Sequence, residues 1–370
     1  MEESYRVRNS ADLFSPSLLF YEDKIRRNLK KALEIAGGPI RLWPHVKTHK
    51  TREIVTMAME QGVRQFKCAT IAEAEMVAMC GAADVLLAYP LVGPNVVRFL
   101  RLIDRYPATR FSSIADDAGA LQALSEAAVE RGVRADVLLD LDTGLHRTGV
   151  ETGDEAVQLY CQIAGSEGLR ARGLHCYDGQ NHQHDPGERT AAAEVCYQAT
   201  MGLRERLISK KLTVETIVMG GTPTFPCYAR HHDVDLSPGT CFLQDWGYMS
   251  SFPDLPFEPA ALLFARVVSV NRKALVFCLD LGYKAIASDP QGIRGVIWNL
   301  EGCVPVLQNE EHWVFRVDAQ KLPEVGQEVY VFPTHICPTS ALHAKACVIN
   351  AESRWYADWA VSARDRILGV

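Results

Sequence analysis

The sequence predicts an α/β protein in two parts: a TIM-type (β/α)8 barrel over residues 15–250 and a β-rich domain over residues 251–370. About eight repeats of a short apolar run and an amphipathic stretch predict the barrel, because alternating strands and helices form parallel sheets. After residue 250, β-rich runs with turn signals follow one another with few helices between them. A length of 370 residues also suits two domains better than one. Residues 1–14 are expected to pack on the second domain.

The barrel is expected to begin with residues 17–37, where the apolar run "SLLFY" leads into a helix that ends at Gly37 and Gly38. Later units repeat this order, and about eight of them in this length suit a closed barrel better than an open sheet. The other expected strands are residues 40–47, 65–70, 83–90, 109–114, 135–144, 170–179 and 214–224, and the expected helices are residues 51–62, 71–81, 94–106, 116–132 and 188–209.

The second domain is predicted from runs rich in β-branched and aromatic residues, which favour strands. A terminal helix is expected from Ala351 onward. The expected strands are residues 261–271, 273–282, 294–300, 313–319 and 327–337.

The composition is that of an ordinary soluble globular protein, with 48% hydrophobic and 23% charged residues. A net charge of −6 gives no reason to expect nucleic acid or an anionic membrane as a partner. No apolar run approaches the roughly 20 residues that span a bilayer. Eleven scattered cysteines without a C-x-x-C motif indicate reduced thiols, and the first residues lack the features of a secretory signal. A cytoplasmic location is therefore expected.

Lys47 ends the expected strand in "RLWPHVKTHK" and shares a face with His45. A lysine at the mouth of a barrel suits Schiff-base formation, because burial disfavours the ammonium form. The alternative is a solvated lysine in a basic turn, and spacing alone leaves both interpretations open. A Schiff-base lysine that holds pyridoxal phosphate would make His45 a further cofactor-binding candidate.

Pyridoxal phosphate also needs a phosphate site, and two glycine-containing turns are candidates. In "VMGGTPT", the residues Gly220, Gly221 and Thr222 follow an apolar strand and offer close backbone approach, free amides and a hydroxyl. In "LSPGTCF", Gly239 and Thr240 are nearby in the sequence. Phosphate in such barrels commonly binds after the last two strands, where these turns are expected, although most Gly-Gly turns are only turns.

Two further candidates follow strands directly. Arg147, in "LDTGLHRTGV", could contact the cofactor or a substrate carboxylate through its fork of donors, or be a surface arginine. Tyr177, in "HCYDG", could pack near the cofactor and donate a hydrogen bond. The histidines in "HQHD", residues 182–185, are expected to lie in a polar loop, since nothing fixes a metal geometry there.

The second domain carries a candidate metal pair in "VFPTHICPTSALH". His335 and Cys337 are two residues apart on an expected strand, so their side chains point the same way. Imidazole and thiolate suit Zn²⁺ better than Mg²⁺ or Ca²⁺, and two protein ligands leave positions open for water or substrate. The alternative is a hydrogen-bonded histidine and a buried thiol. His343 is a candidate third ligand, and Glu311 with His312 either support the metal or lie in an exposed loop.

The motifs "RLWPHVKTHK", "DTGLHRTG", "HCYDG", "GGTPT", "DLGYKA" and "THICPT" occur together and in this order. Together they make the chain similar to the D-threonine aldolase and D-serine dehydratase family of pyridoxal-phosphate enzymes. That family has an alanine-racemase-like barrel followed by a β domain. The resemblance covers nearly the whole chain, and "PHVKTHK" and "HICP" are its most specific parts.

The resemblance implies that Lys47 is the pyridoxal-phosphate lysine, and that His335 and Cys337 hold a divalent metal close to the cofactor. Zinc is expected, with manganese or magnesium as alternatives. Dehydratases of the family typically carry His-x-Cys and aldolases His-x-Asp, so Cys337 favours the D-serine dehydratase-like branch. The usual "EHG" motif is replaced here by Glu311, His312 and Trp313. A homodimer is also implied.

The activity expected from the resemblance is dehydration of a D-3-hydroxy amino acid such as D-serine, D-threonine or 3-hydroxy-D-aspartate, giving a 2-oxo acid and ammonia. The alternative is retro-aldol cleavage to glycine and an aldehyde. An amino-acid racemase has no evident use for the metal pair, and non-catalytic pyridoxal-phosphate carriers usually lack the second domain. A structural zinc protein is disfavoured, since only two ligands are clear.

Overall fold

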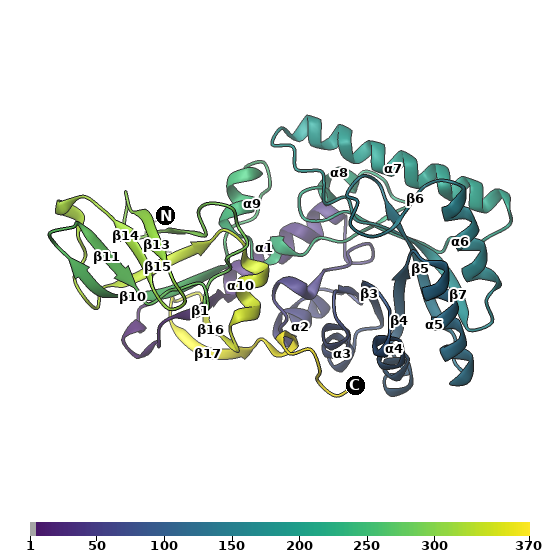
Figure 1. Cartoon of the computed structure of the whole chain (residues 1–370), viewed down its shortest axis with the longest axis horizontal. Coiled ribbons are helices and arrows are strands. Elements are labelled where there is room, and N and C mark those ends of the chain that lie inside the picture. Colours follow the sequence, from purple (N-terminus) through teal and green to yellow (C-terminus); the bar gives the residue numbers. More distant parts are fainter. Residues whose placement is uncertain (1–4) are drawn as a thin grey trace. The chain divides into compact units, whose positions relative to one another are not determined.

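The computed structural model describes residues 5–370, which form two compact units (Figure 1). The unit that we call the barrel unit contains residues 32–47, 54–239 and 365–370. The unit that we call the β unit contains residues 5–31, 48–53 and 240–364. Each unit has a sheet of its own.

The sheet of the barrel unit is parallel and has the strand order β2-β3-β4-β5-β7-β8-β9, with β6 paired to β5. Its strands are short and mostly buried, as expected where helices cover a parallel sheet. Their bounds are β2 Gln65–Cys68, β3 Asp84–Pro90, β4 Arg110–Ala115, β5 Ala135–Asp142, β6 Val150–Glu151, β7 Leu169–Cys176, β8 Thr216–Met219 and β9 Asp235–Leu236.

The segment around Trp43 joins the two edges of this sheet. Leu42 forms a parallel bridge with Leu236 of β9, and His45 forms one with Lys67 of β2. The backbone supports both bridges, since the Trp43 amide donates to Leu236 and the Lys67 amide donates to Pro44. The curled parallel sheet with this segment between its edge strands fits a TIM-like barrel.

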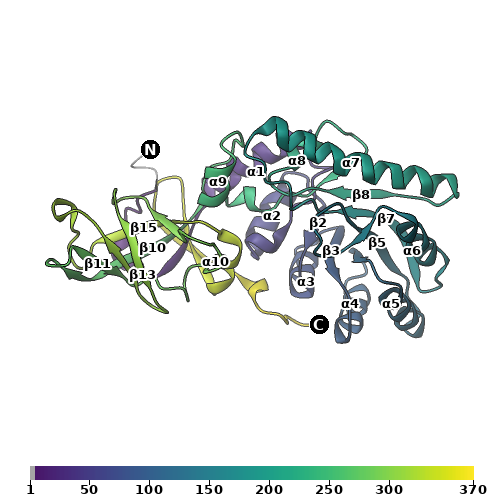
Figure 2. The same cartoon turned by 45° about the horizontal axis from the view of Figure 1, so that its top comes forward.

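The helices of the barrel unit pack along the outer side of its strands (Figure 2). Their first turns follow from local sequence: Thr70, Asp117 and Asp185 cap α3, α5 and α7 by accepting a backbone amide three residues later. The helices of this unit are α3 Ile71–Met79, α4 Pro94–Arg105, α5 Ala118–Glu130, α6 Asp154–Gly165, α7 Pro186–Ser209 and α8 Phe225–Tyr228, whereas α1 Glu22–Ala36 and α2 Arg52–Glu60 begin in the β unit and end in the barrel unit.

The sheet of the β unit is mixed. Its order is β13-β14-β11-β10-β1-β16-β17, and β15 pairs with β10 and β12. The strands are β1 Ser17–Tyr21, β10 Ala261–Asn271, β11 Val276–Leu279, β12 Gly295–Ile297, β13 Val304–Gln308, β14 Trp313–Arg316, β15 Glu328–Pro333, β16 Lys345–Ile349 and β17 Trp355–Ala360, and the helices are α9 Trp246–Ser251 and α10 Ile336–Leu342. Short 3₁₀ turns cover Ser10–Asp12, Val46–Thr48, Thr240–Phe242, Ala319–Lys321 and Ser362–Arg364.

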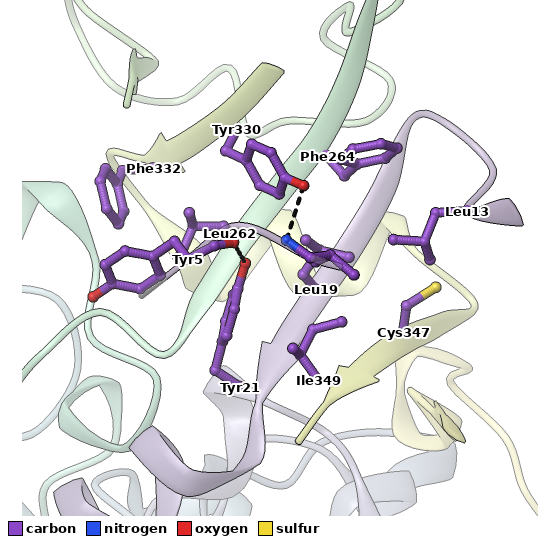
Figure 3. Packing of buried hydrophobic residues seen from close by; sticks show 11 residues of the cluster. Tyr5, Leu13, Leu19, Tyr21, Leu262, Phe264, Tyr330, Phe332, Cys347 and Ile349 are labelled. Atoms are coloured by element: carbon purple, nitrogen blue, oxygen red, sulfur yellow. Dashed lines mark hydrogen bonds between the residues drawn. The ribbon is translucent and has the colours of Figure 1, made fainter. Parts of the chain in front are cut away.

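An aromatic cluster forms the core of the β unit (Figure 3). Tyr5 packs edge-on against Tyr21 and Phe332, at centroid distances of 5.3 and 5.2 Å. Two buried tyrosine hydroxyls satisfy backbone groups: Tyr21 donates to the Tyr5 carbonyl, and Tyr330 accepts from the Val7 amide at 3.1 Å. The buried rings and the hydrogen bonds of their hydroxyls hold the N-terminal segment against residues more than 240 positions later in the chain.

Three local expectations are wrong. The "SLLFY" run forms β1, which pairs with β10 and β16 in the β unit rather than with the parallel sheet. A run buried on both faces reads alike in either sheet, so only the pairing partners distinguish them. Residues 40–47 form bridges and a 3₁₀ turn instead of a regular strand, in keeping with Pro44, which has no amide to donate. The C-terminal segment forms the strand β17, whose burial alternates, and not a terminal helix.

The predicted parallel sheet with covering helices and the β-rich C-terminal region are confirmed. All eleven cysteines are free thiols. Among the described residues, no helix combines the length and the apolar character that a membrane span requires.

Substituting Gly173 by alanine is expected to destabilise the barrel unit. Gly173 lies on β7 opposite Thr216 of β8, and a Cβ there would lie 1.8 Å from the Thr216 carbonyl oxygen. We expect the variant to lose about 1–3 kcal/mol of unfolding free energy, measured by urea denaturation. The matched control is Gly202→Ala in α7, where a Cβ meets nothing within 4 Å and helix propensity favours alanine by about 0.5–1 kcal/mol. Equal stability of the two variants would contradict the close packing of β7 on β8.

Candidate active site

Lys47 lies in the 3₁₀ turn Val46–Thr48, directly after the segment that joins the two edges of the parallel sheet. Its side chain is partly buried, and its amino group lies 5.6 Å from the centroid of the Tyr177 ring. The backbone amide of Lys47 lies 3.4 Å from Nδ1 of His45. The ring of His45 therefore contacts the turn that carries Lys47.

Tyr177 follows β7, and three cationic groups lie around its ring. Besides Lys47, the guanidinium of Arg147 lies 4.9 Å and the amino group of Lys67 lies 5.7 Å from the ring centroid. Cations within about 6 Å of an aromatic face are attracted by the ring quadrupole. The structure thus brings Lys47, Arg147 and Tyr177 together, although 130 residues separate Lys47 from Tyr177.

Two glycines make room for the Tyr177 ring. A Cβ on Gly179 would lie 2.5 Å from Cε1 of the ring, and a Cβ on Gly221 would lie 3.0 Å from Cε2. Any larger residue at Gly179 would therefore push the ring out of its position. The group that Gly221 accommodates here is the tyrosine ring, and the expected close approach of its backbone to a phosphate stays a prediction.

The turn after β8 differs from the expectation of free amides. The Gly220 amide donates to the Cys176 carbonyl at 3.1 Å, and the Gly221 amide donates to Oγ1 of Thr224 at 3.2 Å. The hydroxyl of Thr222 accepts from the Gly239 amide at 3.2 Å, so the two predicted phosphate turns lie side by side. The Gly220 amide thus bonds to the end of β7 and the Gly221 amide bonds within the turn, where Gly220 adopts a positive φ of 77°.

Sequence reasoning missed Lys67, His175 and Asp140, which lie together and buried in the barrel unit. Nζ of Lys67 lies 3.4 Å from Nε2 of His175, and Nδ1 of His175 lies 2.6 Å from Oδ1 of Asp140. Burial, followed by the positive charge of Lys47, lowers the pKa of Lys67 to about 7. A signal was available, because a lysine inside the buried strand "QFKC" is as costly as one at a strand end.

Asp178, the residue after Tyr177, was also overlooked. Its carboxylate is buried and accepts from Oγ1 of Thr224 at 2.8 Å and from the Tyr228 hydroxyl at 2.7 Å. Its negative charge acts on Lys67, whose pKa it raises against the larger effect of burial. Asp178 therefore both anchors the turn after β8 and offsets the positive charge around Tyr177.

The residues around Tyr177 fit a planar anionic aldehyde such as pyridoxal phosphate. Lys47 supplies a primary amine, Lys67 and Arg147 supply positive charge, and Tyr177 supplies an aromatic face. An anionic group would offset the repulsion among the three cations. The chemistry of this donor set is the observation on which the fit rests.

In the β unit, His335 and Cys337 do not lie on a strand. β15 ends at Pro333, His335 is the N-cap of α10, and Cys337 lies in the first turn of that helix. Pro338 favours this helix start, since proline is tolerated in the first turn, and Oδ2 of Asp245 accepts the Ile336 amide at 3.0 Å.

His335 nevertheless contacts Cys337. Burial lowers the pKa of His335, but Cys337 and Asp289 outweigh it and raise the pKa to about 9. Nδ1 of His335 lies 2.5 Å from Oδ2 of Asp289, an arrangement in which a carboxylate orients the ring of a metal-binding histidine. A nitrogen and a sulfur donor fit a divalent metal such as zinc.

Two threonines contact the thiol of Cys337 within the β unit. Oγ1 of Thr48 lies 3.2 Å from Sγ, and Oγ1 of Thr240 lies 3.5 Å from it. Thr240, expected to bind the cofactor, is thus a neighbour of the candidate metal ligand. Across residues 5–370, no group of three or more histidine, cysteine, aspartate or glutamate side chains could hold a metal ion, and the pair His335 and Cys337 stays a predicted metal site.

The remaining candidates have other partners. Nε2 of His343 lies 2.8 Å from the Ala285 carbonyl oxygen. Glu311 and His312 are exposed, and Glu311 pairs with Lys284 at 3.2 Å, which favours the exposed-loop alternative. The "HQHD" segment precedes α7 as a loop, and its Asp185 caps that helix.

Comparison with known proteins gives two family matches. The model of the alanine racemase N-terminal domain matches residues 21–243, and the model of a putative serine dehydratase domain matches residues 260–349. Together they account for most of the chain.

Individual relatives cover nearly the whole chain. D-threonine aldolase of Arthrobacter sp. is 29% identical over 361 residues, 95% of this chain and 92% of the relative. D-threo-3-hydroxyaspartate dehydratase of Delftia sp. is 26% identical over 358 residues, 89% of this chain and 92% of the relative. The crystal structure of D-threonine aldolase from Filomicrobium marinum superposes with a TM-score of 0.89 at 29% identity, covering 97% of each chain.

The buried amine of Lys67 should make stability depend on pH. In the window from its folded pKa of about 7 up to the unfolded value of 10.5, the unfolded chain binds this proton and the folded chain does not. Stability of the parent relative to Lys67→Met should therefore rise with pH by about 1.4 kcal/mol per unit in that window and be constant below it. Urea denaturation between pH 6 and 9 measures the difference, with exposed Lys273→Met as control. Parallel stability curves for the parent and Lys67→Met would show that Lys67 is charged in the folded protein.

Proposed function

Because the chain belongs to the family of the alanine racemase N-terminal domain, we propose that it uses pyridoxal phosphate on Lys47 to dehydrate D-3-hydroxy amino acids. It is a pyridoxal-phosphate-dependent lyase, since its relatives are named as aldolases and dehydratases and its second domain matches a putative serine dehydratase domain. The products would be a 2-oxo acid and ammonia.

The observation that carries the proposal is the position of the Lys47 amine. The amine lies 5.6 Å from the centroid of the Tyr177 ring, which Arg147 also faces. Tyr177 directly follows a strand of the parallel sheet. Pyridoxal phosphate supplies an electron sink for charge that develops at the α-carbon. Lys47 would hold the cofactor as a Schiff base and, once freed by the substrate amine, take the α-proton through Nζ.

Arg147 and Tyr177 would orient the reacting groups. The exposed guanidinium of Arg147 offers a fork of donors for a carboxylate or for an oxygen of the cofactor. Tyr177 presents its ring face between the backbones of Gly179 and Gly221, which limits the space available to a planar ligand. The turns at Gly220–Thr222 and Gly239 are the proposed surroundings of the phosphate, and His45 supports the turn that carries Lys47.

His335 and Cys337 would hold the divalent metal, with zinc proposed on the basis of the nitrogen and sulfur donors. Such an ion acts as a Lewis acid toward a hydroxyl. Asp289 would fix the ring of His335 and its tautomer through the 2.5 Å contact with Nδ1.

Retro-aldol cleavage of the same substrates is the second candidate. The relatives named above include both a D-threonine aldolase and a dehydratase, at similar identity. Cys337 favours the dehydratase, because His-x-Cys is the pattern of the dehydratases that the sequence resembles. A homodimer and a cytoplasmic location stay predictions.

Incubation of the purified protein with D-threonine, pyridoxal phosphate and Zn²⁺ tests the proposal. We expect 2-oxobutyrate and ammonia, identified by mass spectrometry, because β-elimination removes the hydroxyl. Lys47→Ala should lose Schiff-base absorbance and turnover, while Lys273→Ala, at an exposed turn, should retain both. Glycine and acetaldehyde would support the aldolase instead. Full activity and Schiff-base absorbance in Lys47→Ala would remove the central claim.

Cys337→Ala should separate the metal from the cofactor. We expect the variant to keep Schiff-base absorbance, since Cys337 belongs to the β unit, but to lose bound zinc and at least about 100-fold in turnover. Zinc content by atomic absorption and the rate with D-threonine measure the two effects. Cys161→Ala, at an exposed cysteine of α6, is the control. Unchanged turnover in a zinc-free preparation of Cys337→Ala would refute the metal role.

A further inference from the structure

The barrel unit contains a second lysine that the proposed chemistry does not use. Lys67, on β2, is only 2% exposed, and its backbone bridges to His45, two residues before Lys47. A buried lysine is rare, because removing its charge from water is costly unless the amine is paired or neutral. Because Lys67 lies at the same tyrosine ring as Lys47, we infer that its amine has a chemical role there.

Two buried side chains, His175 and Asp140, form a hydrogen-bonded series behind this amine. Oδ1 of Asp140 lies 2.6 Å from Nδ1 of His175, and Oδ2 accepts from the Thr148 hydroxyl at 2.9 Å. A carboxylate at Nδ1 places the ring proton there, so Nε2 presents a lone pair. Nζ of Lys67, 3.4 Å away, can donate an N–H to that lone pair. The series therefore orients the Lys67 amine whether or not it carries its extra proton.

The charges around Lys67 keep both of its protonation states accessible. Burial, Lys47 and Arg147 lower its pKa, while Asp140 and Asp178 raise it, and the outcome is a pKa of about 7. Burial also lowers the pKa of His175, so the imidazole stays neutral as an acceptor. Lysines with a pKa near neutrality are suited to general acid–base catalysis.

We propose that Lys67 is a second acid–base residue of the Lys47 site, with His175 and Asp140 as positioning residues. The proposal rests on the proposed function, but it applies to dehydration and to retro-aldol cleavage alike. After either bond-breaking step a carbon of the product must gain a proton: the β-carbon of the oxo acid or the α-carbon of glycine. Lys67 is the donor of that proton.

The proton balance is simple. An N–H bond of the Lys67 ammonium breaks, a C–H bond forms on the product, and the electron pair stays on Nζ as a neutral amine. The remaining N–H groups keep the bond to Nε2 of His175. Water returns one proton to Nζ before the next turnover, so no oxidant or other reagent is needed.

Two substitutions at Lys67 distinguish a proton donor from a fixed charge. Lys67→Met removes the amine and keeps the volume, whereas Lys67→Arg keeps a charge that does not dissociate at neutral pH. We expect both variants to form the Schiff base with Lys47 and to lose about 100-fold or more in kcat with little change in KM. The parent kcat should fall above a pKa near 7, and this limb should be absent from both variants. Lys273→Met, at an exposed lysine, should behave as the parent.

A titration without turnover provides an independent measurement. In full-length protein labelled with [ε-¹³C]lysine and free of cofactor, the Lys67 resonance, identified by its loss in Lys67→Arg, should titrate near pH 7. Asp140→Asn should move this midpoint to lower pH, because Asp140 raises the pKa of Lys67. A structural role for Asp140 would leave the midpoint unchanged.

Several results would overturn the inference. Restored turnover in Lys67→Arg would show that Lys67 acts as a fixed cation, and loss of Schiff-base absorbance in Lys67→Met would show that it binds the cofactor. Full turnover in Lys67→Met, or a Lys67 resonance that titrates near the ordinary lysine value, would exclude it from catalysis. Failure of the proposed function differs from all of these, because the parent itself would then show no Schiff base or no turnover.

Discussion

The convergence of positive charge on one aromatic ring is the constraint that organises the barrel unit. Lys47, Lys67 and Arg147 lie within 6 Å of the Tyr177 centroid, and after burial the charges of Lys47 and Arg147 lower the pKa of Lys67. Asp140 offsets part of this charge through His175, and an anionic cofactor would offset more. The need to offset this positive charge explains why a carboxylate and an aromatic face lie beside the amines at one end of the parallel sheet.

Backbone packing gives that charge cluster its geometry. The Tyr177 ring occupies space that only glycine leaves open, at Gly179 and Gly221. The turn that carries Lys47 is fixed by the bridges of Leu42 and His45 to the edge strands of the sheet. The position of the amine is therefore a property of the sheet and not of the basic segment "KTHK" itself.

The β unit brings a nitrogen donor and a sulfur donor, His335 and Cys337, close together. His335 and Cys337 achieve this at the start of α10, with Asp289 on one side of the imidazole. Because an N-cap residue has extended backbone, its side chain is free to turn toward the first turn of the helix that follows. The pair predicted from a strand spacing thus exists, but a strand–helix junction produces it.

The sequence by itself determined the alternation of strands and helices and the positions of Lys47 and Tyr177 after strand-like runs, because hydrophobic periodicity and turn residues act over a few residues. Only the tertiary structure decided that β1 joins the β unit and that Lys67 meets His175, 108 residues away. Pairing partners and burial depend on contacts between distant segments, and a buried run reads alike in either sheet. The run "QFKC" signals an unusual lysine, but its partners His175 and Asp140 come from distant segments, so the chemistry of Lys67 follows only from the tertiary structure.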